Sequence, residues 1–288
     1  MELKVASKHK VKMKLAINGC AGSGKTMSAL TIARGLTGDY SKCSIIDCEN
    51  SAELYSDLGA YNLLRIEPPF SPDKYLKALK VCTDAGMQCV IIDGISPCWE
   101  YLLDYHASLP GNGFSNWKFV NPLHQSLMDA IMQADVHIIC TVRSKQEYVL
   151  TDKGNGKLIP EKVSMKPIQR DQVEFLFTLV LDMDISHRAT ATKDRTGLFM
   201  GVSPFIPTEE VGRSILSWCN SGTDVVAPPS FEDVLQAIHE CTTIAELSEL
   251  YYNFPQYQDV LKSEYAARKE TIIANIKNQT VEHGASIS

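Results

Sequence analysis

The sequence lacks the features that mark membrane proteins, secreted proteins and zinc-binding proteins. No hydrophobic run reaches the roughly 18–20 residues that a bilayer-spanning helix needs, and the basic start MELKVASKHKVKMK has no apolar signal-peptide core. The 9 cysteines include no CxxC pair, and neither cysteine nor histidine occurs at metal-ligand spacing. These absences predict a cytoplasmic protein with reduced thiols, no membrane partner and no zinc site.

Charge of one sign does not dominate the chain either. The net charge is −6, although two segments are basic: the N-terminal segment 1–12, and residues 143–170, which hold seven cationic side chains against three acidic ones. The tail from about residue 208 onward is acidic. Composition leaves two interpretations of the basic segments open, an ordinary solvated surface and a surface that faces nucleic acid.

Strand-like and helix-like runs alternate through about the first two hundred residues. Short apolar runs predict strands at residues 13–18, 43–48, 62–67, 88–93 and 136–142. Between them lie amphipathic runs, one of which has a proline near its start and ends at a glycine, as helices often do. This alternation predicts an α/β fold with a mostly parallel central sheet flanked by helices.

The pattern changes after residue 142. The expected elements are a hairpin around residues 154–156, two strands joined by a short turn at 175–184 and 187–194, and a closing helix at 208–219. Residues 221–230 contain glycine and paired prolines without periodicity, which is typical of a linker. The predicted organisation is therefore a domain over residues 1–220, the linker, and a small α-helical C-terminal region over residues 231–288.

A glycine-rich stretch joins the first predicted strand to the next helix. The pattern G-x-x-x-x-G-K-[ST] is matched in full by Gly19, Cys20, Ala21, Gly22, Ser23, Gly24, Lys25 and Thr26. A loop that wraps an anion turns its backbone N–H groups inward, which requires glycine conformations and leaves no room for β-carbons. The helix N-terminus adds partial positive charge. We expect this loop and Met27 to bind ATP, with Lys25 along the β- and γ-phosphates and Thr26 on Mg²⁺.

Carboxylates at the ends of two further strands complete the predicted site. Asp93 ends the apolar run VIID, and the carboxyl ends of parallel strands are where ligands bind, so Asp93 is the second candidate on the Mg²⁺ side. Asp47 and Glu49 follow the second strand on the same side and compete for the role of orienting water. Because Gly94 and not a glutamate follows Asp93, Glu49 is the preferred catalytic base; a turn-capping role is the alternative.

The chain resembles the ATPase core of RecA-type recombinases over about residues 11–205. The stretch IIDCENSAELYSDLGAYNLLRIEPP is similar to the segment in which that family carries Asp-x-Glu, and VIIDGIS resembles its Walker B strand. The motifs GNGFSNWKFVNPLHQSLMDAI, VHIICTVRSK and KDRTG are closer to RecA-like AAA-family ATP-binding proteins of phages and prophages. The resemblance implies a RecA-like P-loop ATPase in which Glu49 activates the attacking water.

The resemblance also implies roles outside the P-loop. RecA-type proteins place an Asn-Gln pair where this chain has Thr141 and Arg143, which makes these two residues candidate phosphate sensors. Lys193 and Arg195 resemble cations that reach a neighbouring subunit's nucleotide, which would require a homo-oligomeric ring or filament; ordinary surface ion pairs are the alternative. The basic segment falls where the family binds DNA, which implies single-stranded DNA as a partner in recombination, annealing or replication.

Two other functions stay open at this point. A small-molecule kinase also uses a P-loop, and residues 143–170 would then be its lid. A nucleotide-gated loader would bind ATP without hydrolysing it and recruit a protein partner through the acidic C-terminal region.

Overall fold

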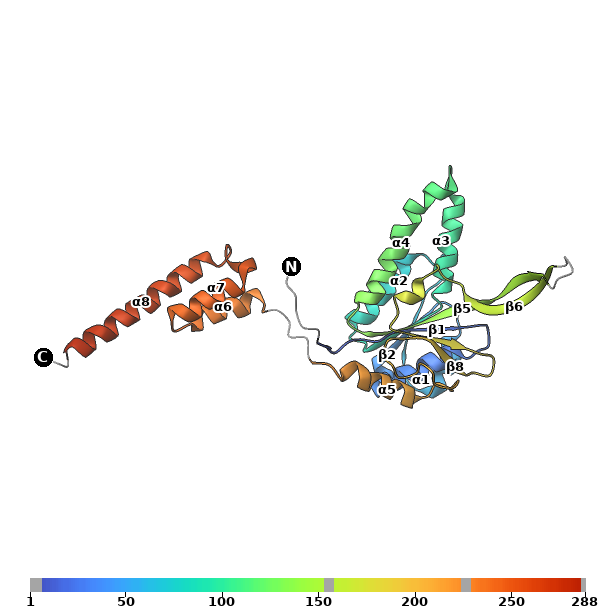
Figure 1. Cartoon of the computed structure of the whole chain (residues 1–288), viewed down its shortest axis with the longest axis horizontal. Helices are drawn as coiled ribbons and strands as arrows, with labels where there is room; N and C mark the ends of the chain where they lie inside the picture. The colour runs from blue at the N-terminus through green and yellow to red at the C-terminus, as the bar shows by residue number, and fades with distance from the viewer. Residues whose placement is uncertain (1–6, 153–157, 224–228, 286–288) are drawn as a thin grey trace. The chain divides into compact units, whose positions relative to one another are not determined.

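The computed structural model describes the backbone of residues 7–152, 158–223 and 229–285, and their side chains except in 146–165 and 276–285. The turn of the predicted hairpin, residues 154–156, lies outside the described residues. The chain forms two compact units, Met1–Asp224 and Val225–Ser288. Figure 1 shows the sheet-containing unit and the helical unit.

The larger unit is built on one sheet. In the described part of the chain the strand order is β3-β2-β4-β5-β1-β7-β8, and β6 pairs with β5 beside this path. The β5–β6 and β7–β8 pairs are antiparallel and the other pairs are parallel. The predicted α/β fold with a mostly parallel sheet is confirmed. The strands are β1 (Lys14–Gly19), β2 (Cys43–Asp47), β3 (Asn62–Arg65), β4 (Cys89–Asp93), β5 (His137–Asp152), β6 (Leu158–Pro167), β7 (Leu179–Met183) and β8 (Ala189–Asp194).

Helices cover both faces of this sheet (Figure 1). One face packs against α1 (Lys25–Thr37) and α5 (Glu209–Asn220). The other packs against α2 (Pro72–Asp84), α3 (Ser96–Ser108) and α4 (Gly113–Gln133). Strands covered on both faces can be apolar at every position, which explains the unbroken apolar run at the start of β4. Short 3₁₀ turns complete this unit: η1 (Tyr40–Lys42), η2 (Ala52–Leu58) and η3 (Val173–Phe175).

Strand β5 is longer than the sequence predicted. The strand expected at 136–142 and the first arm of the following hairpin form one strand of 16 residues. It leaves the sheet and pairs with β6 from Ser144 opposite Pro167 to Asp152 opposite Leu158, and Figure 1 shows this hairpin projecting from the domain. No glycine or proline occurs between residues 137 and 152, so no residue type that commonly ends a strand interrupts it.

The smaller unit is α-helical. Its helices are α6 (Phe231–Glu240), α7 (Ile244–Asn253) and α8 (Lys262–Ala285), with the short turn η4 (Pro255–Tyr257). Capping boxes start the first two, Ser230 with Asp233 and Thr243 with Glu246. Its core includes Val234, Ile238, Leu247, Leu261, Tyr265 and Ile272. Among the described residues of both units, none of the helices combines the length and apolar character needed to cross a membrane.

Candidate active site

The predicted P-loop is a tight turn between β1 and α1. Gly22 and Gly24 have φ angles of 77° and 85°, which side chains rarely adopt. The carbonyl of Cys20 closes the turn by accepting from the backbone N of Ser23 at 3.3 Å and from its Oγ at 2.9 Å. A β-carbon on Gly19 would collide with Ser23 Oγ. The loop therefore has the compact glycine geometry that a phosphate cradle requires.

Lys25 and Thr26 begin α1 with their polar groups directed at this region. The Lys25 ammonium is buried and donates to Cys20 O at 2.9 Å. Burial lowers the pKa of Lys25, and the carboxylates of Glu49 and Asp93 counteract this effect. Thr26 Oγ1 lies 3.0 Å and 3.2 Å from the two carboxylate oxygens of Asp93. A hydroxyl and a carboxylate that meet in this way fit Mg²⁺, which prefers oxygen ligands.

Asp93 is held in place by its neighbour on β5. Asp93 pairs in register with Thr141, whose Oγ1 donates to Asp93 Oδ1 at 2.8 Å. The same hydroxyl accepts from Gly94 N at 2.8 Å. Burial raises the pKa of Asp93 to about 6, and the hydrogen bonds from Thr141 and Thr26 offset only part of that effect. The Thr141 hydroxyl, expected as a phosphate sensor, is thus engaged by Asp93 and Gly94, where it positions the carboxylate.

The two carboxylates that follow β2 have different surroundings. Asp47 is fully buried, and its oxygens accept from Glu49 N at 2.9 Å and from Ala52 N at 3.1 Å. Asp47 therefore fixes the loop. Glu49 Oε1 accepts from Arg143 Nε at 2.7 Å, and a β-carbon on Gly94 would lie only 3.2 Å from Glu49 Cγ. Glu49 is the carboxylate that lies beside the tip of β4.

Arg143 connects this group to β5. Its backbone N donates to Ser96 Oγ at 2.9 Å, and its Nη1 lies 3.9 Å from Glu100 Oε2. It stands opposite Gly19 in the β1–β5 register. The carboxyl ends of β1, β2 and β4, and the point where β5 leaves the parallel sheet, thus bring the P-loop, Glu49, Asp93 and Arg143 to one edge of the sheet.

A family model described as an AAA domain matches residues 11–203. The chain belongs to this family. The match indicates an AAA-type P-loop NTPase, for which nucleotide binding and ATPase activity are the general properties and Mg²⁺ is commonly required. Among proteins with curated functions, none matches this chain.

The structure does not bring Lys193 and Arg195 into the site of the same chain. Strand β8 runs antiparallel to β7, so Asp194 pairs with Leu179, the first residue of β7. Lys193 Nζ donates to the carbonyls of Glu174 at 2.9 Å and Phe175 at 2.6 Å, and Arg195 Nη2 donates to Phe175 O at 3.0 Å. In this AAA-domain protein the two cations therefore lie near the amino ends of β1 and β7, whereas the P-loop follows the carboxyl end of β1. Met27, by contrast, is 39 % exposed in the first turn of α1 beside the loop.

Sequence reasoning missed a histidine beside the P-loop. A β-carbon on Gly24 would lie 2.9 Å from His187 Nδ1, so the imidazole packs against the loop. His187 is in the β7–β8 turn with a φ of 62°, and Asp184 Oδ1 braces that turn by accepting from Ser186 N and Arg188 N. The contact depends on β7 pairing with β1. No local pattern signals it.

Proposed function

We propose that this AAA-domain protein hydrolyses ATP with Mg²⁺ in a cycle coupled to single-stranded DNA. The P-loop amides and Lys25 would hold the phosphates, while Thr26 and Asp93 would hold the metal. Bound Mg²⁺ would supply positive charge that offsets the charge of the phosphates. Support for this comes from the family match and from the convergence of these groups at one sheet edge.

We assign to Glu49 the role of orienting the attacking water and accepting its proton. Arg143 engages its Oε1 at 2.7 Å, and we assign the acceptance of the water proton to Oε2. Water oriented in this way would attack the γ-phosphorus in line with the leaving oxygen of ADP. General-base catalysis of this kind contributes roughly 10²–10⁴-fold.

The coupling to DNA rests on one observation, the position of Arg143. Arg143 pairs with Glu49 through its side chain, and its backbone belongs to β5, which continues directly into the projecting hairpin. Residues 143–170 carry seven cationic against three acidic side chains, a balance that suits contact with a phosphate backbone. Strand binding at the hairpin would therefore act on the residue that holds the catalytic glutamate.

We further propose that the protein works as a homo-oligomer in a recombination or annealing process. Lys193 and Arg195 lie away from the P-loop of their own subunit. A neighbouring subunit would bring them to its nucleotide, where cations stabilise the charge that develops on the transferred phosphoryl group. Support for this role is the resemblance of the KDRTG region to RecA-like proteins.

The test is phosphate release from Mg·ATP with and without single-stranded DNA. We expect DNA to accelerate the wild-type protein, Lys25→Ala to lose hydrolysis, and Glu49→Gln to bind nucleotide but turn over roughly 100-fold more slowly. Glu100→Gln is the matched control, because Glu100 also faces Arg143 but at 3.9 Å. It should turn over nearly as fast as wild type.

The same measurements separate the alternatives. If DNA changes neither the rate nor the oligomeric state, the DNA part of the proposal is wrong and the nucleotide site stands. Phosphate transfer that requires an added small-molecule acceptor would indicate a kinase. Unchanged turnover in Glu49→Gln would indicate that this glutamate is not the base. Binding of Mg·ATP by the wild-type protein without phosphate release would favour a nucleotide-gated loader.

A further inference from the structure

Two tryptophans line a pocket on the α4 side of the sheet, separate from the P-loop region. The pocket has a volume of about 560 Å³, within the range of roughly 300–1,000 Å³ common for small-molecule sites. Trp99 comes from α3 and Trp117 from α4, and both side chains are half-buried. Asn121, Gln125, Arg170 and Gln172 add amides and one guanidinium to the lining.

The tryptophan rings are held in a fixed arrangement. Their centroids lie 6.1 Å apart with an angle of 19° between planes. His106 stacks on Trp117 at 4.2 Å, and His124 forms a T-shaped pair with Trp99 at 5.3 Å. Each indole thus has the other indole and one histidine as ring neighbours, while part of its surface lines the pocket.

The basic segment ends at this pocket. Arg170, its last cation, lines the pocket, and the preceding residue Gln169 is fixed to α4 by a hydrogen bond between its Oε1 and His124 Nε2 at 3.2 Å. Among the described lining residues only Asp171 is acidic, and its Oδ1 lies 3.1 Å from Lys166 Nζ. The lining thus has one cation and one carboxylate, and because the carboxylate is paired with Lys166, Arg170 is the charged group of the lining that can meet an anionic chain.

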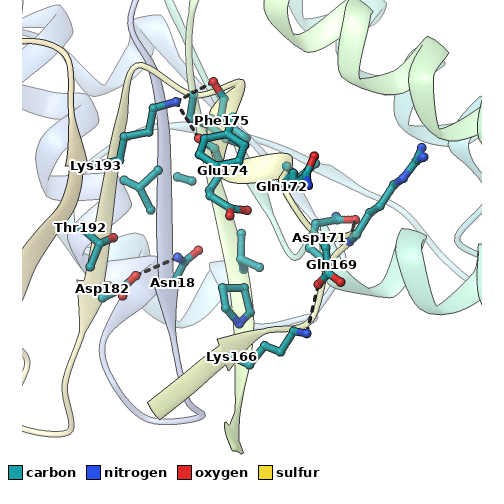
Figure 2. A pocket seen from close by; sticks show the side chains of 17 residues that line it. Asn18, Lys166, Gln169, Asp171, Gln172, Glu174, Phe175, Asp182, Thr192 and Lys193 are labelled. Atoms are coloured by element: carbon teal, nitrogen blue, oxygen red, sulfur yellow. Dashed lines mark hydrogen bonds and ion pairs between the residues drawn. The ribbon is translucent and has the colours of Figure 1, made fainter. Parts of the chain in front are cut away.

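The segment Arg170–Val173 also borders a second pocket, shown in Figure 2, with a volume of about 780 Å³. Asn18 Nδ2 donates to Asp182 Oδ1 at 2.8 Å, and both side chains line this pocket. Phe175, 60 % exposed, and Lys193 lie along the same lining. Past this segment the lining therefore adds an aromatic ring and a cation, together with the carboxylates of Glu174 and Asp182.

We propose that the Trp99–Trp117 pocket binds a base of single-stranded DNA, stacked on the accessible indole surface, with Arg170 on an adjoining phosphate. This inference rests on the proposed DNA-coupled function. Stacking on aromatic rings tolerates any base sequence, because every base has a π-face, and cations along the groove follow the backbone. The amides of Asn121, Gln125 and Gln172 supply donors and acceptors for a base edge.

The chain allows a direct spectroscopic test, because it has only 3 tryptophans. The third, Trp218, is on α5 at the opposite face of the sheet, where Lys8 Nζ lies 4.0 Å from its ring. In a Trp218→Phe background, titration with oligothymidylate in the presence of a non-hydrolysable ATP analogue should quench the emission of Trp99 and Trp117 saturably. Anisotropy of a labelled oligothymidylate measures binding independently.

Affinity measurements on variants complete the test. Trp117→Ala should weaken oligothymidylate binding about ten- to hundredfold, and Trp117→Phe should restore most of it. Because Trp117→Ala removes a ring that also packs on His106, Arg170→Gln provides a second variant outside the helices, with an expected loss of about tenfold. Lys118→Gln is its control, since Lys118 is on α4 beside Phe119 and does not line the pocket.

The outcomes separate this inference from the function on which it rests. Oligothymidylate binding with unchanged tryptophan emission and wild-type affinity in Trp117→Ala and Arg170→Gln would overturn the pocket and leave the DNA-coupled function standing. Absence of any binding by anisotropy would overturn both.

Discussion

Arg143 and Glu49 form an ion pair across the tip of β4, with Arg143 Nε 2.7 Å from Glu49 Oε1. Glu49 follows β2 and Arg143 lies within β5, and these two strands are not neighbours, since β4 lies between them. Gly94, the residue after β4, makes this crossing possible: its φ is 102°, and a β-carbon there would lie 3.2 Å from Glu49 Cγ. A side chain at position 94 would occupy the space that Glu49 uses.

Arg143→Ala should uncouple hydrolysis from DNA without unfolding the protein. The side chains of the pair are 41 % and 24 % exposed, so its loss should change the free energy of unfolding by less than about 1 kcal/mol. We expect ATP affinity near wild type and a DNA-stimulated rate about tenfold lower, because Glu49 loses the group that orients it. Steady-state phosphate release with and without DNA checks this; equal stimulation in variant and wild type would contradict it.

Lys25→Ala should abolish stabilisation of the protein by nucleotide. A ligand present at 100 times its dissociation constant stabilises the folded state by about 2.7 kcal/mol. We expect this gain in the wild-type protein with Mg·ATP and none in the variant, measured as a shift of the thermal midpoint. Lys74→Ala is a suitable control, because Lys74 donates to the carbonyl of Glu67 away from the loop. A full shift in Lys25→Ala would show that nucleotide binds without the lysine.

The parts of the site that sequence could predict are the local ones. The P-loop is a contiguous pattern, and Asp93 ends an apolar strand, so both follow from spacing and from the common edge of parallel strands. The prediction of an α/β fold rests on the same alternation of strand and helix signals. These inferences need no knowledge of which strands are neighbours.

The remaining features depend on strand order and register, which the sequence does not specify. Thr141 contacts Asp93 because β5 is next to β4 in this register, and His187 reaches Gly24 because β7 is next to β1. The ion pair of Arg143 with Glu49 requires three strands in a particular order. Each is a long-range contact that arises only when the chain closes into its sheet.

Gly35→Ala should destabilise the domain, because two helices meet there backbone to backbone. A β-carbon on Gly35 would collide with the carbonyl of Glu209 and lie 2.7 Å from the Cα of Gly212. Neither neighbour is a flexible side chain, so α1 and α5 must separate. We expect the free energy of unfolding, measured with urea, to fall by at least about 1 kcal/mol, with about 3 kcal/mol as the upper end of the usual range. Gly113→Ala is the control, since its β-carbon would find its nearest neighbour at 3.8 Å.

His137 should make folding stability depend on pH in the mildly acidic range. Burial lowers the pKa of His137 from its ordinary value of 6.5 to about 4, and the nearby charges of Lys12 and Lys14 act in the same direction. Its Nδ1 accepts from Met13 N at 3.0 Å, a role that the neutral ring fills. Between these two pKa values the unfolded chain binds a proton that the folded protein does not bind.

The consequence is a stability that is fully present above about pH 6.5 and lost as the pH falls toward 4. At pH 5 the loss should be about 2 kcal/mol relative to pH 7.5, measured by urea unfolding. His137→Asn keeps a hydrogen-bond acceptor but does not titrate in this range. We expect this variant to be less stable than the wild-type protein at pH 7.5. Its loss of unfolding free energy between pH 7.5 and pH 5 should be smaller than that of the wild-type protein by about 2 kcal/mol. Parallel pH profiles for variant and wild type would show that His137 is not the group responsible.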